Sequence, residues 1–428
     1  MPNNEFRSRR EKTEERRKRR NRTLFLSLVV ICVIAVTAVY AFYPFDSSIE
    51  NEEPDPPVEE VINPEKQEDI ELSIVCVGDV MVHKSQIASQ YNKEDGTYNY
   101  DNNFEYVKKY IEEADLALCN VETTFAGGTP SGYPSFNAPD ALADSLARAG
   151  FDVAITSNNH LYDKGYAGME RTLRILREAG LATAGTRLPW EKNYTILNVK
   201  DLKIAVVAYT YETPSYNGRK TINGIQINPD AAELINSFNY DTLDEDLKKV
   251  EATIAEARGE GADIVVCYYH WGEEYQRTPN QWQKYIAKRT VDMGADIIYG
   301  SHPHVLQTVE LITNENTGKQ VPVFYSMGNF ISNQRLETLN NRFTEQGMIA
   351  RVNLKYSVDS GEIVDIKMDA MRTWVNKYRQ ASKDVYAIIP LDENFENNES
   401  LIVSGNLNRA IQASEDVTEV LGSDYIWE

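Results

Sequence analysis

Two kinds of hydrophobic pattern alternate along the chain from Leu72 onward. Short, nearly continuous apolar runs are typical of strands covered on both faces, and apolar positions three or four apart are typical of amphipathic helices. The runs predict strands at residues 73–77, 116–119, 153–156, 203–209, 263–269, 296–299 and 321–325. The helical spacing predicts helices at residues 139–149, 166–179, 243–258 and 281–293.

A glycine follows each predicted helix, as expected for the left-handed residue that commonly ends a helix. These glycines are Gly150, Gly180, Gly259 and Gly294. Alternating strands and helices predict a layered α/β domain, which we place at residues 72–395. Beyond residue 321 the strands come without long helices, as if a sheet edge or a second sheet were being completed. Residues 396–428 are interpreted as a polar, partly helical tail.

An uncharged, mostly apolar segment covers residues 24–43. As a helix it would span ~30 Å, about the thickness of the hydrocarbon core of a bilayer. Residues 1–22 carry ten basic side chains against four acidic ones, so the positive-inside rule predicts a cytoplasmic segment 1–23 and an outward-facing body. A cleaved signal peptide is the alternative, but Thr37-Ala38-Val39-Tyr40-Ala41 is a poor cleavage site. We expect a single-pass anchor in the cell membrane with an extracellular C-terminal domain.

The segment 44–71 is rich in Glu, Asp and Pro and has no apolar period. This composition predicts an extended, self-repelling linker between anchor and body. The whole chain carries a formal charge of −21, so the residues after the basic N-terminal segment carry −27. Such an acidic body argues against nucleic-acid binding, because phosphate capture needs clustered positive charge.

The four cysteines form no disulfide framework. Cys32 lies in the predicted anchor, and Cys76, Cys119 and Cys267 each lie in an apolar run. Three cysteines in the body cannot all pair. We interpret them as buried thiols of the core rather than as redox or metal-binding groups.

All five histidines of the chain lie at or just after the ends of predicted strands, in polar clusters. The carboxyl ends of parallel strands meet at one edge of a sheet, so the loops that follow them converge. These loops could therefore gather Asp79, Glu122, Asn159, His160, His270, His302 and His304. His83 is the least telling of the five histidines, and the alternative for the whole set is five unrelated structural or surface histidines.

Imidazole, carboxylate and amide donors together suit Mn, Fe or Zn ions and suit Ca²⁺ poorly. Mixed nitrogen and oxygen ligands with a bridging carboxylate can hold two ions ~3.5–4 Å apart. Such ions supply a nucleophile at neutral pH and neutralise charge on a phosphoryl group. The sequence therefore predicts a divalent-metal site, for Mn or Fe with Zn as a further candidate, holding one or two ions.

The polar clusters have characteristic sequences and a characteristic order across residues 72–335. They read Val77-Gly78-Asp79-Val80-Met81, Asn120-Val121-Glu122, Asn137-Ala138-Pro139, Asn158-Asn159-His160, His270-Trp271-Gly272, Gly300-Ser301-His302-Pro303-His304 and Ser326-Met327-Gly328-Asn329-Phe330. This series resembles the calcineurin-like metallophosphatase superfamily and, within it, the CapA family of poly-γ-glutamate capsule proteins.

The resemblance implies a calcineurin-like metallophosphatase fold and gives the site residues roles. It implies a metal-binding set of Asp79, Glu122, Asn159, His270, His302 and His304. His160 would be the catalytic residue, an acid or oxyanion stabiliser near the scissile group. The sequence departs from the catalytic pattern of the superfamily in two loops, since Asp-x-His is here Asp79-Val80-Met81 and Gly-Asp-x-x-Asp is replaced by Asn120-Val121-Glu122. Both changes point to a weakened second metal site.

Two functions fit these observations. The first is an extracellular component of poly-γ-glutamate capsule synthesis and export, beside a synthetase and small membrane subunits that the resemblance implies as partners, with the anionic polymer as a possible ligand. The alternative is a metal-dependent phosphoesterase or amide hydrolase of the cell envelope. A strongly acidic body should repel a polyanion unless metal ions or a local basic patch intervene. Candidates for that patch are Arg148, Arg171, Arg174, Arg177 and Arg187, although scattered surface arginines are the simpler interpretation.

Overall fold

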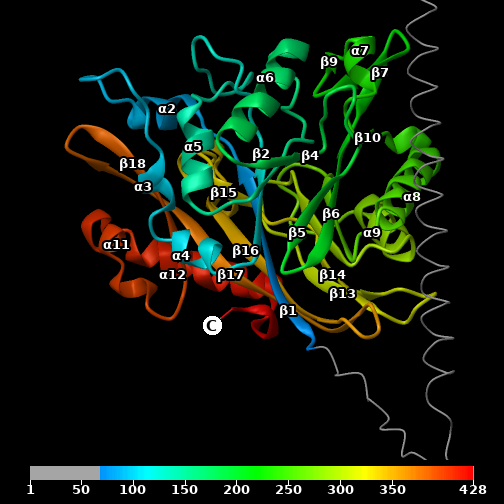
Figure 1. Ribbon diagram of the computed structural model, residues 1–428. Helices are drawn as coiled ribbons and strands as arrows, with labels where there is room; N and C mark the ends of the chain where they lie inside the picture. Colours follow the sequence, from blue (N-terminus) through cyan, green and yellow to red (C-terminus); the bar gives the residue numbers. More distant parts are fainter. Residues whose placement is uncertain (1–67, 428) are drawn as a thin grey trace, which may run out of the picture. The chain divides into compact units, whose positions relative to one another are not determined.

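In the computed structural model, which describes residues 68–427, two β-sheets pack face to face and helices cover their outer faces (Figure 1). This arrangement confirms the predicted layered α/β architecture. The predicted basic segment 1–23, the anchor 24–43 and the linker up to residue 67 lie outside the described residues. Among residues 68–427, no helix combines the length and the apolar character that crossing a membrane needs.

The first sheet has a parallel half and an antiparallel half. Its eight strands within residues 68–427 are β1 (Ile70–Val80), β2 (Leu116–Val121), β3 (Val153–Ile155), β4 (Ala182–Ala184), β15 (Asn329–Ile331), β16 (Gln346–Ser357), β17 (Glu362–Gln380) and β18 (Lys383–Pro390). The spatial order is β18-β17-β16-β1-β2-β3-β4, with β15 paired to β1. Strands β1 to β4 run parallel to one another, whereas β16 to β18 are antiparallel.

The second sheet is mostly parallel. Its seven strands in the described part are β5 (Thr195–Val199), β6 (Leu202–Tyr211), β10 (Ser237–Phe238), β11 (Ile264–His270), β12 (Ile297–Ser301), β13 (Val309–Thr313) and β14 (Gln320–Phe324). The order is β10-β6-β11-β12-β14-β13, with β5 antiparallel to β6. A small third sheet joins β7 (Thr213–Tyr216), β8 (Arg219–Ile222) and β9 (Ile225–Gln226).

The alternation of side chains along each strand divides the core into layers. On β1, Ile74 and Cys76 point between the two sheets, whereas Val75 and Val77 point to the helices on the outer face. Those helices are α2 (Lys84–Gln90), α3 (Asp101–Phe104), α4 (Lys108–Glu112), α5 (Ala141–Arg148) and α6 (Gly165–Glu178). Because every β1 residue from 74 to 77 is buried, the strand reads as a continuous apolar run.

Helices α8 (Leu243–Gly259) and α9 (Gln281–Asp292) cover the outer face of the second sheet. The shorter α7 (Pro229–Ala232) and α10 (Leu336–Leu339) lie in connections. All seven predicted strands and all four predicted helices are confirmed, with ends that differ by at most three residues. The three body cysteines are buried and unpaired, as predicted.

One predicted helix end is wrong. Helix α8 continues through Gly259, and the left-handed residue is Gly261, at φ +87°. The amide of Gly261 donates to the carbonyl of Arg258, so the chain turns two residues later than the first glycine suggested. Gly150, Gly180 and Gly294 do adopt left-handed conformations, as predicted.

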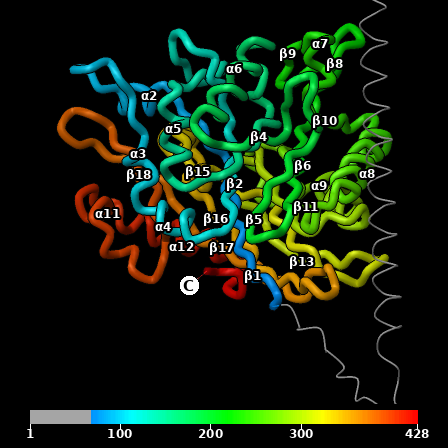
Figure 2. The backbone as a smooth tube through the Cα atoms, in the orientation of Figure 1, coloured from blue at the N-terminus to red at the C-terminus, as the bar shows by residue number. Residues whose placement is uncertain are grey.

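Residues 396–427, predicted as a partly helical tail, contain α11 (Glu399–Ser404) and α12 (Leu407–Leu421). Helix α12 lies against β17, as the red and orange segments of Figure 2 show. Its Val417 and Leu421 join the core between the sheets. Helix α12 therefore covers the antiparallel half of the first sheet on the face that the second sheet covers elsewhere.

Candidate metal centre

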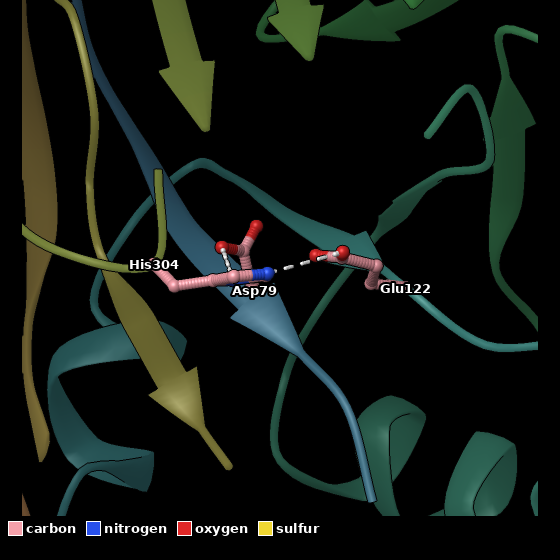
Figure 3. A group of neighbouring side chains, drawn as sticks. All are labelled: Asp79, Glu122 and His304. Carbon is pink, nitrogen blue, oxygen red and sulfur yellow. Dashed lines mark hydrogen bonds and ion pairs between the residues drawn. The ribbon is translucent and has the colours of Figure 1, made fainter. Parts of the chain in front are cut away.

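Three buried side chains from distant segments converge at the carboxyl ends of the strands (Figure 3). Asp79 lies near the end of β1, Glu122 directly follows β2, and His304 lies in the loop after β12. One ligand atom from each lies within 4.8 Å of the others. This buried Asp/Glu/His cluster could hold a metal ion.

Hydrogen bonds fix the orientation of Asp79. His304 Nδ1 lies 2.9 Å from Asp79 Oδ2, and Asn120 Nδ2 donates to Asp79 Oδ1 at 2.8 Å. The Ser301 hydroxyl also donates to Asp79 Oδ1. A register shift in the β1–β2 pairing sets Asp79 opposite Asn120, which brings the two side chains together.

His270 and Asn159 adjoin this cluster. His270 Nε2 lies 3.0 Å from Asn159 Oδ1 and 3.7 Å from Glu122 Oε1. The His302 ring lies 4.8 Å from that of His270 and 5.9 Å from that of His304, between centroids. The structure thus brings together all six residues predicted as a metal-binding set, although their role as ligands stays a prediction.

The donor set fits a divalent cation on two observations. Glu122 Oε1 and His302 Nδ1 are buried and have no hydrogen-bond partner among the described residues, and such atoms are costly unless a ligand binds them. No Lys or Arg of residues 68–427 pairs with Asp79 or Glu122, so only the neighbouring histidines are available to balance the charge of these carboxylates. A cation would satisfy both needs.

The backbone at the two histidines after β12 is strained. His302 has φ +105° and His304 has φ +57°, a region that side chains other than glycine rarely adopt. Such conformations cost ~1–3 kcal/mol and persist where the surroundings impose them. Here they turn the rings of His302 and His304 toward the cluster, with Pro303 between them.

The two carboxylates differ in protonation. Burial alone would raise the pKa of Asp79, but the hydrogen bond and charge of His304, with the charge of His270, hold it well below its usual value. Burial and the neighbouring Asp79 raise the pKa of Glu122 well above its usual value. A cation bound by both carboxylates would therefore displace a proton from Glu122.

The pKa values of the histidines are also shifted in opposite directions. Burial lowers the pKa of His270 to about 3, although the Asp79 charge acts in the opposite direction. Burial and the neighbouring His270 lower the pKa of His302 well below its usual value. Burial would also lower the pKa of His304, but its hydrogen bond with Asp79 raises it. His270 and His302 are consequently neutral at pH 7, the state in which imidazole binds metals.

We expect the metal-free protein to lose stability as the pH falls from 6.5 to 4.5. His83, His270 and His302 have lowered pKa values, so each takes up a proton on unfolding below pH 6.5 and its stabilising contribution is lost. Glu122 has a raised pKa and releases one proton on unfolding, which offsets the uptake by one of these histidines. His304 has a raised pKa and is protonated in both states below pH 6.5, so its contribution to stability does not change there. Near pH 5.5 the net uptake of about two protons lowers the free energy of unfolding by ~2.7 kcal/mol per pH unit. Urea unfolding in a chelating buffer measures this slope.

The control for this slope is His83→Asn, which removes one of the three titrating histidines. It should halve the pH dependence, to ~1.4 kcal/mol per pH unit. A free energy of unfolding that is flat between pH 6.5 and 4.5 would show that these histidines are not buried in the neutral form.

His160 lies beside the cluster and is held by a carboxylate. Its Nδ1 lies 2.8 Å from Asp163 Oδ2, which also accepts the amide of Phe136 at 2.6 Å. The Phe136 ring contacts the His160 ring edge-on at 4.7 Å. His160 directly follows Asn159, whose Oδ1 lies 3.0 Å from His270 Nε2, and this places it beside the cluster. Its predicted catalytic role is untested.

His83 does not join the cluster. Its Nδ1 accepts the amide of Asn333 at 3.3 Å, and its ring contacts Phe136. Burial lowers the pKa of His83 to about 4. The histidine that follows the unusual Asp79-Val80-Met81 loop therefore packs into the protein instead of replacing the missing Asp-x-His ligand.

Three residues at the site were missed from the sequence. Asn120 and Ser301 orient Asp79, and the Tyr211 ring lies 4.8 Å from His302 and parallel to His270. The signal for Asn120 was an amide inside the apolar strand segment Leu-Ala-Leu-Cys-Asn-Val. Tyr211 ends β6, a strand with no histidine, and gave no comparable signal.

Trp271 and Asn329, from two of the motifs, have structural roles near the site. Trp271 is fully buried and its Nε1 donates to the carbonyl of Tyr325 at 2.8 Å, so it packs in the core. Asn329 Nδ2 donates to the carbonyls of His304 and Thr344 at 3.3 and 2.9 Å. Asn329 thus supports the loop that carries His304.

Comparison with known proteins identifies relatives of this chain. Residues 73–334 match the family described as bacterial capsule synthesis protein PGA_cap. The capsule biosynthesis protein CapA of Bacillus anthracis is 31% identical over 288 residues, covering 64% of this chain and 63% of that protein. The PGA biosynthesis protein CapA of Bacillus subtilis is 28% identical over 273 residues, covering 61% of this chain and 64% of that protein. The match thus spans less than two thirds of each relative's length.

Among solved structures, a phosphatase from Mycoplasma pneumoniae aligns with a TM-score of 0.40 and 12% identity, over 71% of this chain and 94% of that one. A protein from Thermus thermophilus aligns with a TM-score of 0.39 and 14% identity, over 70% of this chain and 99% of that one. Scores this low describe a distant likeness only.

Proposed function

This chain belongs to the family of bacterial capsule synthesis proteins, and from that premise we propose that it acts in the synthesis or export of a poly-γ-glutamate capsule. In this proposal residues 24–43 anchor the chain in the cell membrane, and the body faces outward beside a polymer synthetase and small membrane subunits. The descriptions of the two Bacillus relatives, one a capsule and the other a PGA biosynthesis protein, support this role.

The observation that carries the metal-binding part of the proposal is the buried cluster of Asp79, Glu122 and His304 with unpartnered acceptor atoms beside it. We propose that these residues, with Asn159, His270 and His302, hold one or two divalent ions in a metallophosphatase-like fold. The mixture of nitrogen and oxygen donors favours Mn or Fe, with Zn as a further candidate. When bound, such an ion would supply Lewis-acid polarisation of a phosphoryl or carbonyl oxygen.

A second candidate function, hydrolysis of a phosphoester or amide in the cell envelope, is favoured by the His160–Asp163 pair. Asp163 accepts from Nδ1 of His160, which leaves Nε2 as the nitrogen that can give or take a proton. A carboxylate that orients an imidazole in this way is a recurring arrangement in general acid–base catalysis. His160 would then protonate a leaving group beside the metal-binding residues.

The test that separates the two functions is complementation of a deletion strain. Deleting the gene should abolish surface poly-γ-glutamate, and the unaltered gene should restore it. A structural and export role predicts that His160→Ala also restores the polymer to within about twofold, because no proton transfer is needed, whereas a hydrolytic role predicts a loss of ~10²-fold or more in hydrolysis by the purified protein. The polymer is measured by its glutamate content after acid hydrolysis.

The control in this experiment is His83→Ala, since His83 is half-buried and lies outside the cluster. Surface polymer that is unchanged when the gene is deleted would contradict the capsule role. If His160→Ala fails to restore the polymer and the purified protein cleaves a phosphoester or amide only when His160 is present, the hydrolytic function replaces it.

A further inference from the structure

A cavity of about 510 Å³ opens beside the end of β4, outside the metal-binding cluster. Its walls include Arg177, Arg187, Trp190 and Asn236. Trp190 exposes 77% of its surface, more than any other large hydrophobic side chain described. Ligand cavities combine aromatic walls with a few placed polar groups, and this volume lies within their usual range of ~300–1,000 Å³.

Arg187 is the guanidinium of this cavity that lacks a carboxylate partner. Its Nη1 donates to Asn236 Oδ1 at 2.7 Å, and Nη2 donates to the carbonyl of Glu233. Within residues 68–427, no carboxylate oxygen forms an ion pair with Arg187 within 4.0 Å. A half-buried cation held only by neutral acceptors is a favourable place for an incoming anion.

Three acidic side chains at the wall and rim of the cavity are already engaged by other bases, and Glu233, whose carbonyl accepts from Arg187, forms no ion pair with it within 4.0 Å. Glu191 forms a two-pronged pair with Arg177, at 2.8 and 2.9 Å. Glu256 and Glu260 both pair with Lys192 at the rim. Since these carboxylates are held by other bases, the positive charge of Arg187 stays available to a ligand.

A second cavity of about 610 Å³ lies along α6, and Arg177 lines both cavities. Arg171 and Arg174 line this second cavity. The pair between Arg174 and Glu178 is exposed on both sides, at 55% and 58%. Exposed pairs of this kind contribute little, so a ligand carboxylate can take the place of Glu178.

We propose that these two cavities bind an extended polycarboxylate, with one carboxylate at Arg187 beside the Trp190 indole and the next one at the exposed Arg174. This inference deepens the proposed function, on which it rests for the source of the ligand, by giving the anionic capsule polymer a binding surface. A chain with net charge −21 should repel a polyanion as a whole. A local basic surface is enough to attract the polymer at one place.

The first cavity lies directly behind the loop that carries Asn159 and His160. Its wall residue Thr186 lies 2.8 Å from the Thr156 hydroxyl, between side-chain oxygens, and its amide donates to the same hydroxyl at 3.0 Å. Thr156 begins the segment that leads to Asn159 and His160. A polymer held at Arg187 is therefore held one strand away from the metal-binding residues.

The test is calorimetric titration of the full chain with a short γ-linked glutamate oligomer. Arg187→Gln should weaken binding roughly tenfold, since it removes one charge-assisted contact. Trp190→Ala should weaken binding by about threefold or more and does not disturb the fold, because the indole is exposed. Binding should also weaken as salt is added.

Matched controls are Trp282→Ala, an exposed indole on α9, and Arg148→Gln, an exposed arginine paired with Asp101. Both should bind the oligomer as the unaltered chain does. The proposal is overturned if the unaltered chain fails to bind, if Trp190→Ala binds equally well, or if an oligomer with amidated side chains binds equally well. Competition by inorganic phosphate at the oligomer's own concentration would likewise overturn it, because it would indicate a site for small anions.

The outcome of the gene deletion separates this inference from the proposed function. If the gene deletion leaves the capsule intact while the oligomer still depends on Arg187 and Trp190, the proposed function fails and the polycarboxylate site stands.

Discussion

Asp79→Ala is expected to leave the purified protein without its metal. Asp79 is the residue that His304, Asn120 and Ser301 all contact, so its removal takes away one ligand and the anchor of another. Loss of a residue that merely orients a ligand costs 10–100-fold in metal affinity, so loss of the ligand itself should cost more than ~100-fold. Elemental analysis of the full chain, with one or two ions per chain expected before the change, measures the effect.

Two further variants make this result interpretable. Asp79→Asn keeps the shape of the side chain but removes its charge and replaces one acceptor oxygen by an NH2 group, and it should lose the metal while remaining folded by circular dichroism. Asp163→Asn changes another buried carboxylate, which contacts His160 and none of the six predicted ligands, and it should keep the metal. Metal that persists in both Asp79 variants would place the ion elsewhere.

The largest effect on stability is expected from Glu345→Ala. Both oxygens of this buried carboxylate accept from Arg409, at 2.6 and 2.8 Å, and one also accepts from Arg335 and from Trp374 Nε1, each at 3.1 Å. Arg335 is itself 1% exposed, so the change removes its buried carboxylate partner and leaves it only the exposed Glu337, 3.4 Å from its Nε. Breaking a buried pair in this way costs ~3–5 kcal/mol of unfolding free energy. Urea unfolding measures the loss.

Glu337→Ala is the matched control for Glu345→Ala. Glu337 also pairs with Arg409, at 2.6 Å, but its side chain is 55% exposed. Exposed pairs contribute ~0–1 kcal/mol, so the unfolding midpoint should hardly move. Equal losses from the two changes would mean that the Glu345 carboxylate is hydrated and that α12 is held by its apolar side chains alone.

Part of the candidate site could be predicted because the loops that follow parallel strands converge at one edge of a sheet. Asp79, Glu122 and Asn159 follow parallel strands of the first sheet, and His270 and His302 follow parallel strands of the second. The rule predicts that each set gathers at one edge, because parallel strands end on the same side. That the two edges face each other depends on how the sheets pack, which no local pattern contains.

The residues that orient the cluster were harder to predict for a related reason. Asn120 reaches Asp79 because the pairing of β1 with β2 shifts register between Val77 and Asp79. A shift of one residue exchanges the two faces of a strand, and the alternation of side chains in either strand gives no sign of it. The positive φ of His302 and His304 was equally hidden, since glycine usually marks such positions.

The contacts of the C-terminal region could not be predicted from its sequence pattern. The buried positions Ala410, Ala413, Val417 and Leu421 have the three-to-four spacing of a helix face. The same sequence carries the charged Arg409 and Asp416, which gave the segment a polar character. Both turn out to pair across the fold, Arg409 with Glu345 and Asp416 with Arg342. Tertiary pairing of this kind leaves no trace in the local sequence.

The division of the cluster between two sheets bears on how the molecule is made. Asp79 and His304 are separated by 225 positions along the chain, so their meeting requires closure of a very long loop. Contacts of such sequence separation form late, after local segments have folded. A nascent chain still lacking its second sheet would hold the acidic half of the cluster alone, and ion capture would therefore belong to the last stage of biogenesis.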